Sequence, residues 1–377
     1  MKILVLNYEF PPLGGGAGNA TYYLLKEFSK IKNLEIDLVT SSVNESKVEN
    51  FSDKIKVHYL DVNKNGNLHY QRMTELLKYA LRARKYCKKL IALNKYDLVH
   101  AFFGIPCGYV AKNLNLPFIV SLRGSDVPFY NDRFYWLDKL LFVRMSKNIW
   151  KRAKKVIANS LDLKNKALLT NPRQPIDVIY NGVDIKEFTS SNRNKKEVVF
   201  ISTSRLIKRK GIDILVEAFL KIVGDYKNAR LVLIGGGNME AELKRIVIEK
   251  GLSKNIEFAG VLKHEEISEY LGQADAMVLP SKNEGMSNSL LEAMASGLAI
   301  ITSNTGGAKE IIKDNGIILS NRSVDAVYKS MKSICEDNKY LKKLKIASRK
   351  KAEELSWSNM ANKYMTVYRS IAELKNN

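Results

Sequence analysis

The segment that most constrains the fold is residues 276–297, in which a short apolar run, a polar loop and a helical pattern follow one another. The run 276–280 (AMVLP) is typical of a buried strand that ends at its proline. Residues 287–289 (SNS) are favourable N-cap residues for a helix that begins near Leu290. A strand, a loop and a helix in this order form the unit of a parallel α/β sheet, which binds ligands beyond the carboxyl ends of its strands. The amides and the dipole of the helix start favour a phosphate there.

Two glutamates bracket the expected helix start, Glu284 in the loop and Glu292 in the first turns of the helix. Neither carboxylate is needed to form a loop or a helix, so both are candidates for a ligand site. A local explanation also exists, because Ser289 and Glu292 match a capping box in which the glutamate reaches back to the serine N–H. Glu284 is less readily explained by local structure, although a solvated loop residue is an alternative. The local pattern leaves these explanations open.

Short apolar strands alternate with helical segments in both halves of the chain, which predicts parallel α/β topology. The strand patterns occur at residues 3–6, 35–40, 55–60, 98–102, 118–122 and 155–160, and again at 198–203, 231–234, 256–261, 276–280 and 300–303. Residues 189–196 (TSSNRNKK) are polar and typical of a linker. We therefore expect an N-terminal Rossmann-like domain over residues 1–188, a linker over 189–196 and a C-terminal Rossmann-like domain over 197–355.

The composition indicates a globular protein, since 45% of the 377 residues are hydrophobic and 27% are charged. No apolar run approaches the length of a membrane-spanning helix, and residues 1–6 enter a short strand rather than a signal peptide. We therefore expect a cytoplasmic protein. Three scattered cysteines, Cys87, Cys107 and Cys335, have neither zinc-site nor disulfide spacing.

The formal net charge of +22 is spread over both halves of the chain, but two stretches are particularly basic. Seven lysines and arginines lie between Glu75 and Asp97, and seven more lie between Asp138 and Val156, with no acidic residue inside either stretch. The second stretch interleaves large apolar residues, a pattern suited to an anionic lipid surface at the inner face of the membrane. A partly buried helix with a solvated lysine face explains it equally well. Nucleic acid binding is not expected, because no nucleic-acid motif accompanies the charge.

A glycine-containing loop follows the first predicted strand. Residues 14–18 have the pattern Gly-x-Gly-x-Gly, not the Gly-x-Gly-x-x-Gly of dinucleotide-binding proteins. Asp37 lies within the next strand, whereas a ribose-binding acid is expected just beyond it. The pattern therefore disfavours a dehydrogenase. A tight turn that needs glycines only for its backbone geometry is an alternative to a ligand-binding loop.

Residues 204–211 (SRLIKRKG) lie between a predicted strand and a predicted helix. Four cations in this position are typical of a polyphosphate site, because paired phosphates need compensating charge as well as amide donors. Arg205 and Lys210 form an Arg-x-x-x-x-Lys-Gly frame. Lys208 and Arg209 are also explained as solvated side chains.

These segments resemble the retaining nucleotide-sugar glycosyltransferases of family four, which have the GT-B fold. The resemblance rests on two glutamates with seven residues between them, followed by AMASG at residues 293–297, on the Arg-x-x-x-x-Lys-Gly frame, and on the loop FPPLGGG at residues 10–16. It covers nearly the whole chain. It implies two Rossmann-like parallel-sheet domains that face each other across a cleft and close over the donor, with residues 356–377 forming a helix that crosses back to the first domain.

The resemblance also implies roles for individual residues. Glu284 would lie against the hydroxyl groups of the donor sugar, and Glu292 would accept hydrogen bonds from the ribose. Arg205 and Lys210 would bind the donor diphosphate and stabilise the leaving nucleotide. The other donor-binding residues implied in this way are Gly15 and Gly16 in the N-terminal loop, Gly236 and Val261 near the nucleotide, and Gly285, Met286, Ser287 and Asn288 near the sugar and phosphates.

One position departs from the family pattern. Arg123 begins residues 123–126 (RGSD), where many members have a histidine beside the reacting carbon. A guanidinium stays charged and cannot act as a base, so no proton-transfer role is expected here. We expect Arg123 to pair with a phosphate or with an anionic acceptor, and Asp126 to orient it or to contact an acceptor hydroxyl. His100, at the end of another strand, is more simply explained as structural.

The resemblance implies a glycosyltransferase, and more narrowly a hexosyltransferase, whose donor would be a nucleotide sugar, with UDP favoured. The basic amphipathic stretch favours a glycan or a lipid-linked molecule as the acceptor, and hence a role in cell-surface polysaccharide synthesis. The chain contains no Asp-x-Asp sequence, so we expect no metal and no cofactor, with cations and helix dipoles balancing the diphosphate. Two alternatives share this architecture, namely a sugar-nucleotide epimerase or phosphorylase, and a non-catalytic nucleotide-sugar-binding partner of another transferase.

Overall fold

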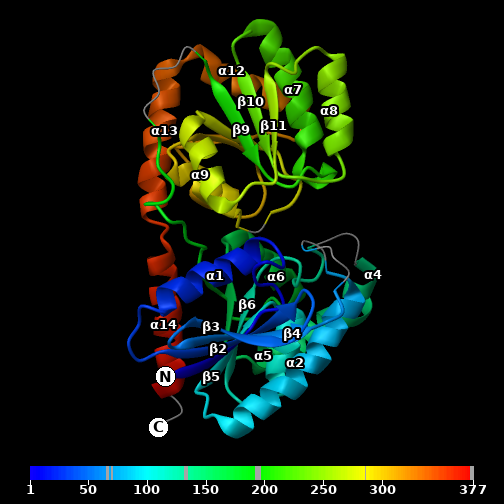
Figure 1. The fold of residues 1–377 in the computed structure, drawn as a ribbon, viewed down its shortest axis with the longest axis vertical. Helices are drawn as coiled ribbons and strands as arrows, with labels where there is room; N and C mark the ends of the chain where they lie inside the picture. The colour runs from blue at the N-terminus through cyan, green and yellow to red at the C-terminus, as the bar shows by residue number, and fades with distance from the viewer. Residues whose placement is uncertain (65–67, 69–70, 131–134, 192–196, 285, 374–377) are drawn as a thin grey trace. The chain divides into compact units, whose positions relative to one another are not determined.

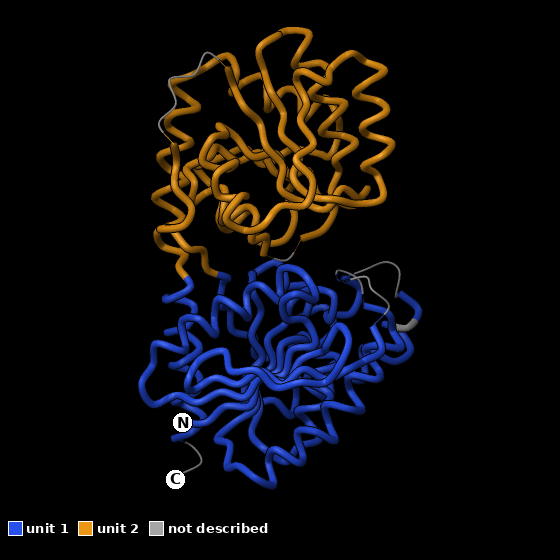
Figure 2. Tube along the Cα trace, in the orientation of Figure 1, with its two compact units in different colours: residues 1–181, 357–377 blue, residues 182–356 orange. Residues whose placement is uncertain are grey.

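The computed structural model describes residues 1–64, 68, 71–130, 135–191, 197–284 and 286–373. The chain forms two compact units (Figure 2). The first unit comprises Met1–Asn181 and Trp357–Asn377, and the second comprises Gly182–Ser356. Each unit has its own core of buried aliphatic and aromatic side chains.

The first unit is built on an eight-stranded sheet in the order β3-β4-β2-β1-β5-β6-β7-β8 (Figure 1). Neighbouring strands are parallel except for β3, which pairs antiparallel with β4 at one edge. The strands are β1 (Lys2–Leu6), β2 (Glu35–Ser42), β3 (Lys47–Ser52), β4 (Ile55–Asp61), β5 (Leu98–Phe102), β6 (Phe118–Leu122), β7 (Lys155–Ala158) and β8 (Asp177–Val178). Strands β5 and β6 are buried along their whole length, which explains their continuous apolar character in the sequence.

Helices from both ends of the chain cover this sheet. Helix α14 packs against α1, and the ring of Tyr23 stacks on that of Trp357 with the ring centroids 5.1 Å apart. The helical segments of the first unit are α1 (Gly16–Phe28), α2 (Met73–Leu93), η1 (Gly104–Gly108), α3 (Tyr109–Lys112), α4 (Tyr135–Leu137), η3 (Asp138–Phe142), α5 (Val143–Arg152), α6 (Leu161–Thr170) and α14 (Trp357–Glu373).

The second unit has a six-stranded, wholly parallel sheet in the order β11-β10-β9-β12-β13-β14. Its strands are β9 (Val199–Thr203), β10 (Arg230–Ile234), β11 (Ile256–Gly260), β12 (Ala276–Leu279), β13 (Ala299–Ser303) and β14 (Gly316–Leu319). This is the Rossmann order, in which the winding of the sheet reverses between β9 and β12. The prediction of two Rossmann-like parallel-sheet domains is therefore confirmed.

Most helices of the second unit connect these strands, and the last two follow β14 (Figure 1). Helix α12 packs beside α7, and α13 packs beside α10. The helical segments are η4 (Lys208–Lys210), α7 (Ile212–Asp225), α8 (Glu240–Glu249), α9 (His264–Gln273), α10 (Asn288–Ala295), α11 (Ala308–Ile311), α12 (Val324–Glu336) and α13 (Asn338–Glu353).

The two units divide after Asn181 and after Ser356, whereas the sequence pattern placed the first boundary after residue 188. Residues 182–191 belong to the second unit because their backbone is hydrogen-bonded within it. Val183 donates its N–H to the Leu355 carbonyl at 3.0 Å, and Arg349 donates to two carbonyls of this segment. The rest of the expected linker, residues 192–196, lies outside the described residues.

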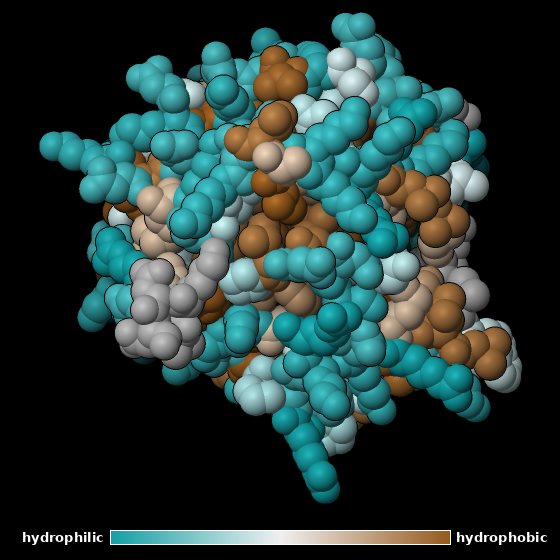
Figure 3. Space-filling view, turned by 90° about the horizontal axis from the view of Figure 1, so that it is seen from below, coloured by the Kyte–Doolittle hydropathy of each residue, from teal (hydrophilic) through white to brown (hydrophobic). Residues whose placement is uncertain are grey.

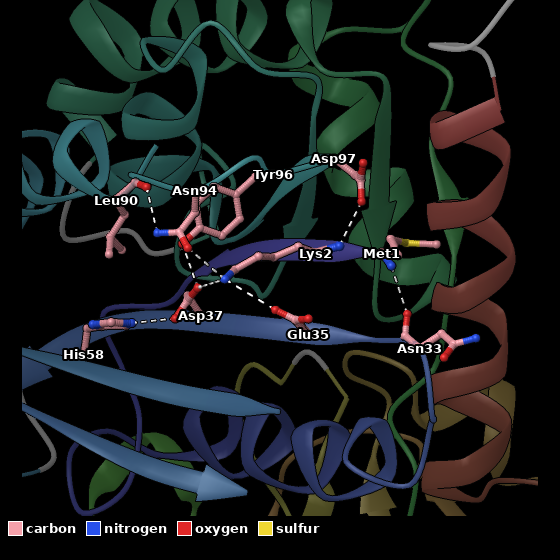
Figure 4. Close-up of polar contacts among 10 residues, drawn as sticks. All are labelled: Met1, Lys2, Asn33, Glu35, Asp37, His58, Leu90, Asn94, Tyr96 and Asp97. Carbon is pink, nitrogen blue, oxygen red and sulfur yellow. Dashed lines mark hydrogen bonds and ion pairs between the residues drawn. The ribbon is translucent and has the colours of Figure 1, made fainter. Parts of the chain in front are cut away.

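Asp37 belongs to a polar cluster in the first unit (Figure 4). Asp37 lies inside β2, in register with Leu4 of β1. One carboxylate oxygen lies 2.8 Å from His58 Nε2, and the other accepts a hydrogen bond from the Tyr96 hydroxyl at 2.6 Å. Although burial opposes it, these hydrogen bonds lower the pKa of Asp37, with a further contribution from the charge of Lys2. Asp37 therefore stabilises the sheet, which agrees with its exclusion as a ribose-binding acid.

The basic stretch after Asp138 forms η3 and α5 in succession. Ile149 and Trp150 of α5 are completely buried, whereas Leu140 of η3 is 70% exposed. One part of the stretch therefore packs in the core, as the interpretation of a partly buried helix predicts, and another part presents apolar side chains to solvent. Among the described residues, no helix has both the length and the apolar character needed to cross a membrane.

Candidate active site

The loops after β9 and β12 bring together residues from two separate sequence motifs. These strands are neighbours where the winding of the second sheet reverses, the position at which open α/β sheets bind ligands. Lys210 follows β9 and Glu284 follows β12, and the Lys210 ammonium donates a hydrogen bond to the Glu284 carboxylate. Both side chains are only 14% exposed. Arg205 lies in the same loop as Lys210 and is exposed.

Contacts between the two loops hold this ion pair in place. Lys282 donates its N–H to the Arg209 carbonyl at 2.8 Å, and Arg209 Nη1 donates to the Asn283 carbonyl at 2.8 Å. Gly211 has φ +70°, and a Cβ atom there would lie 2.4 Å from the Pro280 carbonyl oxygen. Only glycine permits this approach. The Arg209 side chain therefore joins the loops, which the sequence pattern did not reveal.

The start of α10 follows the same loop. Ser287 is the N-cap residue, its side chain makes no capping hydrogen bond, and Asn288 is the first helical residue. Met286 is buried, and Gly285 lies outside the described residues. Because Ser289 lies inside the helix, it is not the N-cap that the capping-box explanation of Glu292 required. The backbone N–H groups of this helix start are suited to an anion.

The glycines after β10 pack against the loop that carries Arg205. A Cβ atom on Gly235, whose φ is +127°, would lie 2.2 Å from a backbone carbonyl oxygen of residues 204–206, and one on Gly237 would lie 2.3 Å from another. These two glycines are therefore required by packing. A Cβ atom on Gly236 would lie 3.1 Å from a methyl group of Val261, whose side chain is 75% exposed.

Glu292 interacts with His264, a residue that the sequence analysis did not single out. His264 Nε2 lies 3.5 Å from a Glu292 carboxylate oxygen, and its Nδ1 lies 2.6 Å from a Glu187 carboxylate oxygen. The ring of Phe188 packs edge-on against the imidazole, with the ring centroids 5.1 Å apart. Although burial opposes it, the two carboxylates raise the pKa of His264 to about 9. The ring is therefore a cation at neutral pH that holds two carboxylates.

The N-terminal glycines of the first unit fall into two groups. A Cβ atom on Gly14, whose φ is +96°, would lie 2.6 Å from the Glu9 Cβ atom, and one on Gly18 would lie 3.1 Å from a backbone carbonyl oxygen. Gly15 and Gly16 are exposed at the start of α1, and a Cβ atom on Gly15 would meet nothing within 4 Å. Packing therefore requires glycine at positions 14 and 18, whereas packing does not require it at position 15.

Arg123 follows β6 and is half-buried. Its Nη1 atom donates a hydrogen bond to the side-chain oxygen of Asn181 at 2.9 Å, and its guanidinium lies 4.6 Å from the centroid of the Phe102 ring. Burial lowers the pKa of Arg123, and the neighbouring Tyr364 and Asp126 oppose this effect. The aromatic ring and the amide position the guanidinium without neutralising it.

Asp126 acts on the backbone of the loop and not on the Arg123 side chain. One carboxylate oxygen accepts hydrogen bonds from the N–H groups of Arg123 and Gly124, at 2.9 and 3.0 Å. The other accepts the N–H of Gly104, the first residue of η1, at 2.6 Å. Burial raises the pKa of Asp126, and these three backbone donors oppose the rise. Asp126 therefore fixes the loop from which Arg123 projects.

His100 belongs to a buried network that joins β5 and β6 to the C-terminal helix. Its Nδ1 atom lies 2.6 Å from the Tyr368 hydroxyl, and its Nε2 atom lies 2.8 Å from the Ser121 hydroxyl. The Ser121 hydroxyl also lies 2.9 Å from that of Tyr364. Burial, with a smaller contribution from Arg123, lowers the pKa of His100 well below its ordinary value. His100 is therefore a neutral structural residue, as the sequence pattern favoured.

The groups that the second unit brings together are cations, a helix start and a carboxylate. Cations and a helix start suit phosphate oxygens, and a carboxylate suits hydroxyl groups. In the part of the chain that the structure describes, no group of three or more histidine, cysteine, aspartate or glutamate side chains could hold a metal ion.

Comparison with known proteins identifies relatives along the whole chain. The profile of the family Glycosyltransferase Family 4 matches residues 14–187, and that of the family Glycosyl transferases group 1 matches residues 183–351. An uncharacterized glycosyltransferase of Methanocaldococcus jannaschii is 26% identical over 99% of both chains. The alpha-monoglucosyldiacylglycerol synthase of Acholeplasma laidlawii is 26% identical over 85% of both.

Two solved structures share the fold. The sucrose-phosphate synthase of Thermosynechococcus elongatus has a TM-score of 0.84 at 22% identity, over 98% of this chain and 99% of its own. Anabaena HepE in complex with UDP and glucose has a TM-score of 0.76 at 19% identity, over 98% of this chain and 100% of its own. With both family profiles matched in succession and the same fold in these structures, the chain belongs to the group 1 glycosyltransferases of GT-B fold.

Proposed function

We propose that the chain is a retaining, metal-independent glycosyltransferase whose second unit binds a nucleotide-sugar donor. The observation that supports this most strongly is the Lys210–Glu284 ion pair at the point where the winding of the second sheet reverses. A sugar diphosphate needs cations for its phosphate oxygens and a carboxylate for its hydroxyl groups, and this pair supplies one of each. A UDP-sugar is the proposed donor, because the similar Anabaena structure holds UDP and glucose.

In the proposed reaction, the bond between the anomeric carbon of the sugar and the diphosphate oxygen breaks. The diphosphate leaves with the bonding electrons, and the acceptor oxygen forms a new bond to the same carbon with retention of configuration. The acceptor proton passes to the departing diphosphate. Arg205 and Lys210 stabilise the negative charge that develops on the diphosphate, while Glu284 holds the sugar hydroxyls and Glu292 the ribose. The absence of an Asp-x-Asp sequence supports charge compensation by these cations.

The remaining residues receive supporting roles in this proposal. Backbone groups of Met286, Ser287 and Asn288 contact the sugar and phosphates, and Gly236 and Val261 border the nucleotide. In the first unit, the exposed Gly15 and Gly16 offer backbone groups to a substrate. Arg123 and Asp126 serve the substrate from the loop after β6, Asp126 through the backbone that it fixes.

Binding of nucleotides tests this proposal directly. We expect uridine diphosphate to raise the melting temperature of the purified protein more than guanosine or adenosine diphosphate, equally with and without magnesium, because a ligand stabilises the state that binds it. The variant Lys210→Ala should lose most of this shift, whereas Lys244→Ala, which removes an exposed lysine from α8, should keep it. A shift that appears only with magnesium contradicts metal independence, and no shift with any nucleotide contradicts the proposal.

The acceptor is proposed to be a glycan or a lipid-linked molecule handled at an anionic membrane surface. Trp136 and Leu140 are each 70% exposed, and Leu141 is 49% exposed. Lys139 Nζ lies 5.7 Å from the centroid of the Trp136 ring, and further lysines and arginines of α5 are exposed. Figure 3 shows apolar side chains that reach the surface among hydrophilic ones. Exposed apolar side chains beside cations suit the boundary between lipid headgroups and acyl chains.

Sedimentation with lipid vesicles tests this surface. We expect the protein to bind vesicles that contain phosphatidylglycerol and not vesicles of phosphatidylcholine alone, and to bind less as salt is added. The double variant Trp136→Ser, Leu140→Ser should abolish binding. The matched control is Leu169→Ser, which removes an 80% exposed leucine from α6. Equal binding by the double variant and the control contradicts a membrane role for this surface.

A further inference from the structure

We propose that Arg123 binds an acidic group, a carboxylate or a phosphate monoester, that is carried by the sugar of the donor or by the acceptor. The proposal rests on the glycosyltransferase function proposed above and names a chemical feature of its substrate. It concerns a position at which this chain has a permanent cation, at the carboxyl end of β6. Ligands of parallel α/β sheets bind at that edge.

The guanidinium of Arg123 has one edge without a partner. Its Nε and Nη2 atoms are buried and make no hydrogen bond to any described residue, whereas Nη1 is engaged by Asn181. In an arginine side chain, Nε–H and one Nη2–H point in the same direction from one edge of the planar group. Two parallel donors of this kind match the two oxygens of a carboxylate or a phosphate.

The charge of Arg123 is only partly balanced, by the nearby Asp126, which does not pair with it directly. No ion pair among the described residues includes Arg123, and the nearby Asp126 carboxylate already accepts three backbone N–H groups. His100 is neutral, and Phe102 offers only the face of its ring. Partly burying a cation without a directly paired counter-charge is unfavourable, and unsatisfied buried donors are uncommon in native proteins. A substrate anion that completes this site accounts for both features.

The loop around Arg123 is built to hold the side chain in one place. Asp126 ties the backbone of Arg123 and Gly124 to Gly104, so that the loop after β6 is fixed to η1. Phe102 supports the guanidinium from one side, with 4.6 Å between the guanidinium carbon and the ring centroid. A positioned donor pair loses little freedom when an anion binds, which favours affinity and selectivity.

The test compares acidic ligands with neutral counterparts by thermal shift and calorimetric titration. The donor arm compares UDP-glucuronic acid with UDP-glucose. The acceptor arm compares glucose 6-phosphate with glucose in the presence of UDP. A third arm uses malonate, a dicarboxylate that contains neither sugar nor nucleotide. The proteins are the wild type, Arg123→Gln, Arg123→Lys and the control Arg84→Gln, which removes an exposed arginine from α2.

We expect at least one acidic ligand to bind the wild type and Arg84→Gln about 10- to 100-fold more tightly than it binds Arg123→Gln, the range for loss of a charge-assisted donor pair. Arg123→Lys should recover part of the loss, because it keeps the charge without the planar fork. The donor and acceptor arms then tell which substrate carries the acid.

Equal affinities of the wild type and Arg123→Gln for every acidic ligand would overturn the proposal, as would an equal loss for UDP itself, which would place Arg123 on the diphosphate. If no nucleotide binds the wild type, the proposed function fails, while the malonate arm still decides whether Arg123 binds an anion.

Discussion

At the scale of single residues, the central feature is that Glu284 and Lys210 form one unit. They lie 74 residues apart in the sequence, yet one side chain donates to the other. We expect Glu284→Gln to lower kcat by roughly 100-fold or more with little change in melting temperature, because in the proposed function the carboxylate acts on the sugar and it is not part of the hydrophobic core. Lys210→Ala should have a similar effect, and the double variant should lose less than the product of the two single losses.

Steady-state kinetics with the donor found by thermal shift measures this coupling. The control pair is Glu240 and Lys244, an ion pair between side chains of α8 that are 31% and 48% exposed, whose double alanine variant should retain wild-type kcat. Normal turnover by Glu284→Gln would show that this glutamate is not catalytic. Strict additivity of the two losses would show that the residues act independently.

Residues with distinctive spacing could be singled out from the sequence, whereas residues whose role depends on a partner could not. Glu284 and Lys210 were predicted from motifs, and the structure joins them. His264 carries no local signal, because its partner Glu187 lies 77 residues away. Asp126 was expected to contact the arginine side chain or an acceptor, whereas its carboxylate accepts backbone N–H groups. Such roles depend on which residues contact each other in the folded chain, and a single sequence does not show these contacts.

At the scale of secondary-structure elements, His264 links the start of α9 to α10 and to the segment that opens the second unit. The charged groups that face the imidazole are Glu292 from α10 and Glu187 from that segment, while Glu265 and Glu266 follow on α9 itself. Arg349 of α13 donates to the Ile185 and Phe188 carbonyls, so it supports the segment. This arrangement keeps the ring protonated in the folded state.

The pH dependence of stability follows from this pKa. The pKa of His264 is about 9 in the folded protein and about 6.5 in an unfolded chain, so the folded state binds the proton more tightly. Its contribution, at most about 3 kcal/mol, is fully present below pH 6.5 and is lost as pH rises through 9. We therefore expect the difference in unfolding free energy between the wild type and His264→Gln to be largest near pH 6 and to fall to a smaller, pH-independent value above pH 9.

Urea unfolding at several pH values measures this difference, and Glu187→Gln provides the matched variant. Glu187→Gln keeps the histidine but removes one of its two carboxylates, so the total loss of stability should be smaller and should be complete at a lower pH than in the wild type. A pH-independent difference between the wild type and His264→Gln would mean that the ring is not held as a cation.

The boundaries of the elements show which parts of the fold the sequence patterns predict and which they do not. The buried strands β5, β6 and β12 coincide with apolar runs, because burial on both faces leaves a continuous signal. From the sequence, the segment 182–191 was assigned to the first domain and the linker. In the structure, hydrogen bonds join its backbone to α9 and α13, and its polar side chains give no indication of this. Backbone hydrogen bonds of this kind produce no recognisable pattern of side chains in the sequence.

At the scale of the whole molecule, the first unit is formed by two segments that are far apart in the sequence, because the last helix, α14, belongs to it. Helix α14 buries Tyr364 and Tyr368 against residues some 240 to 270 positions earlier, with the Tyr368 hydroxyl 2.6 Å from His100. The first unit is therefore complete only when the end of the chain has been added. Separate cores predict separate unfolding transitions.

The variant Tyr368→Ala tests this arrangement. It removes a completely buried aromatic side chain and leaves His100 without its hydroxyl partner, so we expect the first unit to lose roughly 3–5 kcal/mol of stability. In scanning calorimetry one transition should move to lower temperature, while the transition that uridine diphosphate raises should stay in place. Arg369→Ala, which changes the exposed neighbour of Tyr368, should move neither. If Tyr368→Ala shifted both transitions equally, the two units would unfold as one, and the C-terminal helix would stabilise the whole chain instead of the first unit alone.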